Sequence, residues 1–248
     1  INKISLFCNV SKNCVIVEKD VDVSIYQIPL ILSNAGLDQL ILDHFQIKKP
    51  VASLEDWENL IKTIKNLDGE IRIALVGKYS ELQDAYKSVD EALIHAGYAS
   101  SKNVIIEKIG AEEIEMNPNI LDKVSGILIP GGFGARGIEG KIQAAKYARE
   151  KKIPFLGICL GLQCAVIEFS RNVCNLDGAH TTEFCEESDY TTLHPVVCLM
   201  NEQEGITKKG GTMRLGSYPC NIIKETKVYH AYQDDKVFER HRHRYEVN

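Results

Sequence analysis

The chain has 248 residues, of which 44% are hydrophobic and 25% are charged, and its formal net charge is -5. This length suffices for one large domain, or for one domain with an appendage, and the apolar content is ordinary for a soluble globular protein. No apolar run approaches the roughly 18 residues of a membrane span, so we expect no membrane partner. The negative charge argues against nucleic acid as the main partner.

The first residue and the cysteines indicate the origin of the chain and the redox state of its thiols. The sequence opens on Ile1 without a methionine, which indicates a fragment and leaves a lost targeting segment open. Its eight cysteines form no Cys-x-x-Cys pair, so we expect no zinc ribbon, no thioredoxin-type site and no metal. Their scatter among apolar residues is typical of reduced thiols in a cytosolic protein.

The N-terminal stretch differs in character from the rest. Residues 1–51 form one segment, and a linker helix is predicted within residues 52–69, where Leu54, Trp57 and Ile61 recur at helical spacing. Ser53 and Asp56 make a plausible start signal for this helix. We place a boundary near Gly69, so that residues 70–248 form the main domain.

Strands and helices alternate through the next hundred residues. Strands are predicted at Ile71–Val76, Val104–Ile109, Gly126–Ile129 and Ile153–Ile158, and helices at Asp84–Ala96, Glu139–Lys151 and from the last strand to about Cys174. This alternation predicts an α/β fold, a mainly parallel sheet with helices on both faces.

After about Asn175 the pattern changes to short strands. They are predicted at Val196–Met200, Thr212–Leu215, Tyr218–Ile223, Lys227–Tyr232 and Val237–Val247. We expect them to form an antiparallel extension on the edge of the sheet.

The most informative motif is Gly157-Ile-Cys-Leu-Gly161, between the fourth strand and its helix. It is the cysteine version of the strand–turn–helix nucleophile elbow, in which the nucleophile sits on a sharp turn. A side chain two residues before or after Cys159 would collide with that turn. The helix N-terminus favours a thiolate at Cys159, which we take as the nucleophile.

A glycine-rich loop, Pro130-Gly-Gly-Phe-Gly134, follows the third strand. With Gly137 it matches the dinucleotide fingerprint formally, but the fingerprint belongs on the first strand, with an acid about 20 residues on. We favour a loop beside the elbow whose N–H groups, with that of Leu160, form an oxyanion hole. A plain tight turn is the alternative.

Other candidates are ambiguous from their residues alone. Glu183 by itself is typical of a solvated loop, and Gln163, one helical turn after Cys159, could face the cleft or be a packing residue. The run Arg240-His-Arg-His-Arg244 either binds phosphates or carboxylates or is a solvated edge strand. No spacing marks a catalytic base among the remaining histidines, His95, His180, His194, His230, His241 and His243, and His44 lies in the N-terminal segment.

Taken together, these stretches resemble the glutaminase domain of the CTP synthase family, a triad-type glutamine amidotransferase. Residues 1–51 resemble the tail of that family's synthetase domain. The matching runs are Gly77-Lys-Tyr79, Asp84-Ala-Tyr-Lys-Ser88, Pro130-Gly-Gly-Phe-Gly134, Gly157-Ile-Cys-Leu-Gly-Leu-Gln163, Gly210-Gly-Thr-Met-Arg-Leu-Gly216 and Glu239-Arg-His-Arg-His-Arg-Tyr-Glu-Val-Asn248.

The resemblance implies roles for particular residues. Cys159 would attack the side-chain amide of L-glutamine and form a glutamyl thioester. Glu183 would face the substrate ammonium group and Arg244 its α-carboxylate. The remaining oxyanion-hole and substrate contacts would come from Gly132, Leu160, Gly161, Leu162 and Gln163, and those to the activator GTP from Arg136, Gly137 and Glu139.

The resemblance also implies a whole-enzyme activity. It is that of a cytoplasmic, homo-oligomeric ligase that forms C–N bonds, whose synthetase domain uses ammonia, ATP and Mg to convert UTP to CTP. The glutaminase domain itself would need no cofactor.

The family's catalytic base lies in a His-x-Glu motif beyond the stretch that ends here at Asn248. We therefore expect either that the protein continues or that this fragment cannot complete the cycle. The alternatives are another cysteine hydrolase of the same fold, of γ-glutamyl hydrolase type, and a non-catalytic regulatory or assembly module.

Overall fold

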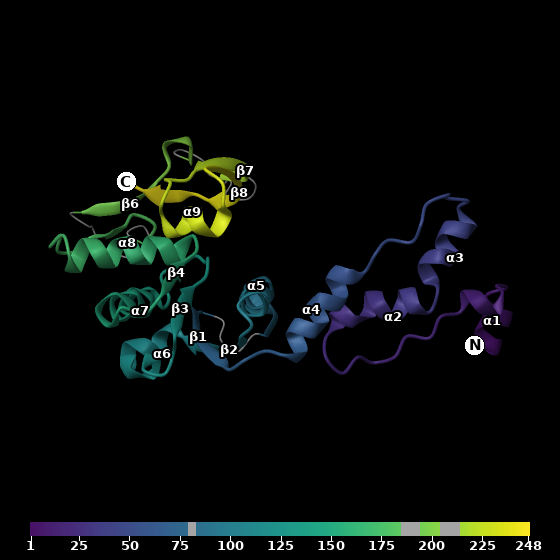
Figure 1. Ribbon diagram of the computed structural model, residues 1–248. Coiled ribbons are helices and arrows are strands. Elements are labelled where there is room, and N and C mark those ends of the chain that lie inside the picture. The colour runs from purple at the N-terminus through teal and green to yellow at the C-terminus, as the bar shows by residue number, and fades with distance from the viewer. Residues whose placement is uncertain (79–82, 185–193, 204–213) are drawn as a thin grey trace. The chain divides into compact units, whose positions relative to one another are not determined.

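The computed structural model describes residues 1–78, 83–184, 194–203 and 214–248. The chain divides into two compact units (Figure 1). The first comprises residues 1–71 and 88–105, and the second comprises residues 72–87 and 106–248.

The first unit is helical. Its helices are α1 (Asn2–Phe7), α2 (Ile28–Asn34), α3 (Leu37–His44), α4 (Glu55–Lys65) and, from its second residue on, α5 (Lys87–Ala99). The predicted linker helix is α4, which buries Ile61. The Tyr26 ring lies 6.0 Å from that of Trp57 in α4, and the Tyr26 hydroxyl is 2.5 Å from Nε2 of His95 in α5.

The second unit contains most of a four-stranded sheet in the order β2-β1-β3-β4. These strands are β1 (Glu70–Gly77), β2 (Asn103–Gly110), β3 (Gly126–Ile129) and β4 (Phe155–Gly157). β3 runs parallel to both of its neighbours, with Ile73 opposite Gly126 and Ile129 opposite Gly157. The predicted α/β fold with a mainly parallel sheet is confirmed.

Three helices pack in succession beside this sheet: α6 (Ala111–Met116) on α7 (Ile138–Lys151), and α7 on α8 (Leu160–Asn172) (Figure 1). One apolar core lies among the strands, α6 and α7, and includes Val76, Ile114 and Ile129. A second core lies under α8 and includes Ile142, Leu160 and Ile167. The first core holds α6 and α7 on the strands and the second holds α8 on α7, because burying each such side chain contributes about 1.5–3 kcal/mol.

The C-terminal strands form two further sheets. β5 (His180–Thr181), β6 (Pro195–Leu199) and β9 (Tyr245–Val247) make one, in which β6 and β9 are antiparallel. The other is the antiparallel hairpin of β7 (Arg214–Asn221) and β8 (Lys236–His243). The expected antiparallel strands are therefore present, and among the described residues they pair with one another rather than with the four-stranded sheet.

Four of the predicted strands need correction. The strand predicted at Val237–Val247 is two strands, β8 and β9, which are separated at Arg244. Residues 227–232 form a helix, α9 (Lys227–Tyr232), because the Thr226 hydroxyl caps it by accepting a 3.2 Å hydrogen bond from the N–H of Tyr229. The described residues of the strands predicted at Thr212–Leu215 and Tyr218–Ile223 lie in or directly after one strand, β7. Thr212 and Met213 lie outside the described residues. Short α6 was not predicted.

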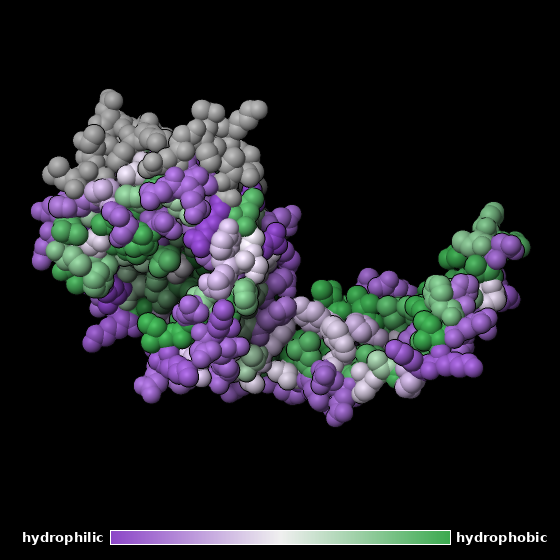
Figure 2. All heavy atoms as spheres, turned by 90° about the horizontal axis from the view of Figure 1, so that it is seen from above, coloured by the Kyte–Doolittle hydropathy of each residue, from purple (hydrophilic) through white to green (hydrophobic). Residues whose placement is uncertain are grey.

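Single 3₁₀ turns complete the described elements, at Lys12–Cys14, Ile25–Gln27, Gln83–Tyr86, Pro118–Leu121 and Asn201–Gln203. None of the helices in the described ranges is long and apolar enough to span a membrane. Figure 2 shows hydrophilic and hydrophobic side chains together on the surface of both units.

Candidate active site

Cys159 sits on a strained turn between β4 and α8. Its φ is 53° and its ψ is −107°, a backbone conformation that a residue with a side chain adopts only when its surroundings impose it. The N–H of Ile158 donates to the carbonyl of Ile129 in β3 at 2.9 Å, and the N–H of Gly161 donates to Ile158 at 2.9 Å. These bonds fix the strand end and the helix start, and they place Cys159 at the exposed tip of an elbow.

The two glycines of the motif permit this turn. A Cβ atom at Gly157 would lie 2.4 Å from the carbonyl carbon of Gly161, and one at Gly161 would lie 2.1 Å from the carbonyl oxygen of Ile129. Both neighbours are backbone atoms, which cannot rotate away as a side chain can. The predicted steric reason for the Gly-x-Cys-x-Gly spacing is confirmed.

The glycine-rich loop lies against the elbow. A Cβ atom at Gly131 would be 3.4 Å from Cβ of Cys159, and one at Gly132 would be 3.3 Å from a methyl group of Leu160. Gly134 has φ 80°, in the left-handed region that favours glycine. The loop backbone therefore lies beside the nucleophile.

A cavity of about 430 Å³ opens at the elbow. It brings together Cys159 with four of the substrate-binding candidates, which come from segments far apart in the sequence. Its lining is formed by Gly131, Gly132, Phe133, Cys159, Gln163, Glu183, Arg242, His243, Arg244 and Tyr245. Phe133, Arg242, His243 and Tyr245 were not predicted as site residues, although the last three lie in or beside the basic run.

The surroundings of the Cys159 thiol act in opposite directions on its ionisation. Although the residue is exposed, the protein atoms around its sulfur partly desolvate the thiol and raise its pKa. A hydrogen bond from the N–H of Leu160 lowers the pKa, and the charge of Glu183 raises it. The outcome is a pKa above the ordinary value, so desolvation outweighs the helix N-terminus that the sequence suggested would favour a thiolate. The Leu160 N–H nevertheless lies where it can reach a reacting group at the sulfur.

Glu183 and Gln163 both line the cavity. An oxygen of Glu183 accepts from the N–H of Gly134 at 3.5 Å, which ties it to the glycine-rich loop. Gln163 is buried on the first turns of α8, and its Nε2 donates to the carbonyl of Tyr245 at 3.1 Å. Of the two readings of Gln163, the structure places it at the cleft with its amide already engaged.

Arg244 lies between β8 and β9 and lines the cavity. Its Nε is buried and, among the described residues, has no hydrogen-bond partner. A buried donor without an acceptor costs about 1–3 kcal/mol, so this atom favours a ligand that accepts a hydrogen bond. The arrangement suits an anionic group.

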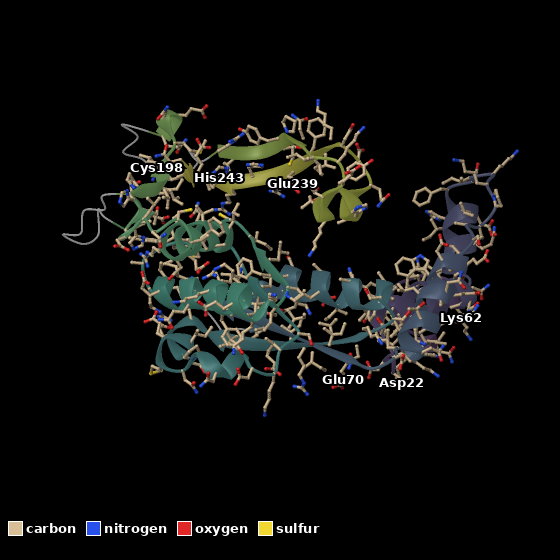
Figure 3. The ribbon with its side chains drawn as sticks, turned by 60° about the vertical axis from the view of Figure 1, so that its left-hand side comes forward. Asp22, Lys62, Glu70, Cys198, Glu239 and His243 are labelled. Atoms are coloured by element: carbon tan, nitrogen blue, oxygen red, sulfur yellow. The ribbon has the colours of Figure 1, made fainter. Side chains whose placement is uncertain are left out.

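The histidines separate into one at the cavity and others elsewhere. His243 lies at the end of β8, further along the strand than Glu239 (Figure 3). Its Nδ1 is 3.0 Å from the carbonyl oxygen of Tyr245, and its Nε2 is 3.0 Å from Nδ1 of His241. His180 packs on Phe184, and burial lowers its pKa.

The remaining candidates line no part of this cavity. Arg136 pairs with Glu112 at 2.7 Å and donates to the carbonyl of Lys78 at 3.1 Å, and Glu139 accepts from Arg171 at 2.9 Å. Gly137 has φ 71° and begins α7. The proposed substrate contacts Gly161 and Leu162 are in the first turn of α8. Gly161 is buried and Leu162 is half exposed. Gly210 to Met213 lie outside the described residues.

In the described part of the chain, no three histidine, cysteine or acidic side chains lie close enough together to hold a metal ion. The candidate site is therefore built from an elbow cysteine, backbone donors, one carboxylate and the basic run that carries Arg242 and Arg244.

The glutamine amidotransferase class-I family matches residues 81–248. The chain belongs to this family. A second family, described as CTP synthase N-terminus, matches residues 1–47. This amidotransferase chain is 51% identical over 248 residues to the CTP synthase of Fibrobacter succinogenes, covering 100% of the chain and 43% of the relative. It is 52% identical over 248 residues to that of Caldanaerobacter subterraneus, covering 99% and 45%.

The amidotransferase chain thus spans less than half the length of these relatives. Among solved structures it is similar to the glutaminase domain of Trypanosoma brucei CTPS with bound acivicin. The TM-score is 0.64 at 39% sequence identity, and the match covers 72% of this chain and 68% of the other.

Proposed function

We propose that this chain hydrolyses L-glutamine through Cys159 and is the glutaminase part of a CTP synthase. The observation that carries the proposal is the single cavity that joins the elbow cysteine to Gly132, Glu183 and Arg244. Glutamine carries a charge of each sign at its α-carbon, and the cavity offers the opposite charge for each.

The chemistry follows from these groups. The Cys159 thiol gives up its proton as its sulfur attacks the amide carbon of the substrate, and the oxyanion that forms accepts hydrogen bonds from the N–H groups of Gly132 and Leu160. The C–N bond breaks as ammonia leaves with that proton, and a glutamyl thioester remains. Water then adds to the thioester, the C–S bond breaks, and glutamate and the thiol are released.

Substrate recognition is assigned to the charged side chains. Glu183 faces the ammonium group, and Arg244 donates to the α-carboxylate from the buried Nε that has no partner in the described structure. Each charge-assisted hydrogen bond is worth about 1.5–3 kcal/mol. Gln163 closes the cavity wall, and Gly161 and Leu162 complete the substrate contacts in the first turn of α8.

The whole protein's activity is part of the same proposal. Its ammonia reaches a synthetase domain of the same polypeptide, which uses ATP and Mg to aminate UTP, in a cytoplasmic homo-oligomer. Residues 1–51 are the tail of that domain, 52–69 a linker and 70–248 the glutaminase domain. The apolar side chains exposed on the first unit, such as Leu6, Phe7 and Phe45, support packing against further protein. Arg136, Gly137 and Glu139 are proposed to respond to GTP.

Ammonia release tests the proposal. We expect ammonia release from L-glutamine and much slower hydrolysis of a γ-glutamyl peptide, followed by the release of its amino acid, and we expect Cys159→Ala to abolish both. Faster cleavage of the peptide would favour a γ-glutamyl hydrolase, and turnover of neither would favour a non-catalytic module. Acivicin, bound to the Trypanosoma brucei relative, should protect Cys159 from alkylation while the exposed Cys8 and Cys174 still react.

A further inference from the structure

The carbonyl oxygen of Tyr245 is a junction beneath the cavity. It accepts a hydrogen bond from Nε2 of Gln163 at 3.1 Å and faces Nδ1 of His243 at 3.0 Å. A carbonyl oxygen has two lone pairs, so it can accept both. The junction ties α8 to the segment that joins β8 and β9.

The hydrogen bond between His243 and Tyr245 spans one residue, Arg244. A side chain at one position and the carbonyl two positions later close a short loop around it. The carbonyl oxygen of Arg244 accepts from the N–H of Met200 at 3.0 Å. The backbone of Arg244 is thus held by its own bond to Met200 and by the bonds to the carbonyl of its neighbour Tyr245, whereas its Nε has no partner within the described ranges.

The proton positions on the two histidines follow from their partners. Because the Tyr245 oxygen can only accept, Nδ1 of His243 carries the hydrogen, and in the neutral ring Nε2 then accepts from Nδ1 of His241 at 3.0 Å. Burial is the largest of the effects that lower the pKa of His241, which favours the neutral ring. The chain of donors runs from His241 through His243 to Tyr245.

We propose that His243 is a positioning residue: its Nδ1–H, bonded to the Tyr245 carbonyl, holds Arg244 where its buried Nε meets the carboxylate of the substrate. An arginine side chain is rich in rotamers, and fixing its backbone in advance lowers the ordering cost of binding. Both ring nitrogens of His243 are already hydrogen-bonded, so its role here is not that of the base for Cys159. The inference rests on the proposed function, because it takes the α-carboxylate of glutamine as the partner of Arg244.

The test measures equilibrium binding in the full-length protein carrying Cys159→Ala, so that nothing is hydrolysed. Two ligands are compared by calorimetry: L-glutamine and its α-amide, which lacks the carboxylate charge. His243→Leu removes the donor. His243→Asn is the matched control, because its Nδ2 is as many bonds from the backbone as Nδ1 of histidine and can donate to the same oxygen.

We expect His243→Leu to weaken glutamine binding about three- to tenfold, the effect of one hydrogen bond, and to leave binding of the α-amide unchanged. His243→Asn should stay within about twofold of the parent. Equal affinity for glutamine in all three proteins, or equal loss for both ligands in His243→Leu, would overturn the inference. If His243→Leu is unfolded by circular dichroism, His243→Ala takes its place.

These binding measurements distinguish an error in the proposed function from an error in the role of His243. If the parent protein binds neither ligand, or binds both equally, the proposed function itself is wrong. If the parent prefers glutamine but the variants do not separate, only the role of His243 is wrong.

Discussion

Replacing Gly161 by alanine should disable the elbow while leaving most of the protein folded. The new Cβ atom would lie 2.1 Å from the carbonyl oxygen of Ile129, about 1.3 Å short of the 3.4 Å at which ordinary contact begins. That oxygen also accepts the 2.9 Å hydrogen bond from Ile158, the residue before the nucleophile. The oxygen cannot retreat without loosening this bond, so the clash reaches Cys159 directly.

The stability cost is moderate. Overpacking costs about 1–3 kcal/mol. Loss of the Ile158 hydrogen bond adds about 1 kcal/mol, and alanine gains at most about 1 kcal/mol over glycine within a helix. The last two nearly cancel, which leaves about 1–3 kcal/mol against a typical total of about 5–15. A misplacement of about 1 Å, however, can lower turnover about a hundredfold.

Gly140→Ala is the matched control. Its Cβ atom would lie 1.8 Å from the carbonyl oxygen of Ala111, a comparable backbone clash between α6 and α7 rather than at the elbow. Urea unfolding should show similar destabilisation of both variants, and glutaminase assays at 25 °C should show loss of turnover per folded molecule only for Gly161→Ala. Wild-type turnover in Gly161→Ala, or an equal loss in Gly140→Ala, would refute the reasoning.

Three further predictions concern charge and protonation. Glu183→Ala and Arg244→Ala should each weaken glutamine use about ten- to a hundredfold in steady-state assays. The use of free ammonia by the intact enzyme should be unaffected. Equal loss of both activities would indicate misfolding instead. Burial raises the pKa of Cys164 to about 12, so above the ordinary value near 9 the unfolded thiol ionises first and stability falls as pH rises. In urea unfolding, the free energy of unfolding should fall less between about pH 8 and pH 10 for Cys164→Ala than for the wild type. The same fall in both proteins would contradict this prediction. Arg149 donates to the buried Glu168 at 2.7 Å. Because the arginine is about one-third exposed, Glu168→Ala should lower the free energy of unfolding in denaturant by about 1–3 kcal/mol, less than for a fully buried pair. An unchanged free energy of unfolding would show that solvent replaces the contact.

The sequence alone determined the features whose causes are local. The strand ends at Gly77 and Ile129, and the spacing of Gly157, Cys159 and Gly161, follow from short-range sterics and hydrophobic pattern, and the structure has them where they were expected. The one helix predicted as a strand, α9, is rich in β-branched and aromatic residues, and its Thr226 cap was the signal that the pattern concealed.

Only the tertiary structure decided which distant residues share the cavity. Glu183 and Arg244 gather at Cys159 because β5, β6 and β9 pair beside α8, a consequence of burial and strand pairing that no spacing in the sequence records. The same packing singles out His243 from the other histidines, since its partner at Tyr245 also receives Gln163 from α8. The tertiary structure also raises the pKa of Cys159, the opposite of what the helix N-terminus alone predicted. Desolvation depends on every atom packed around the sulfur, whereas the start of the helix can be recognised in the sequence.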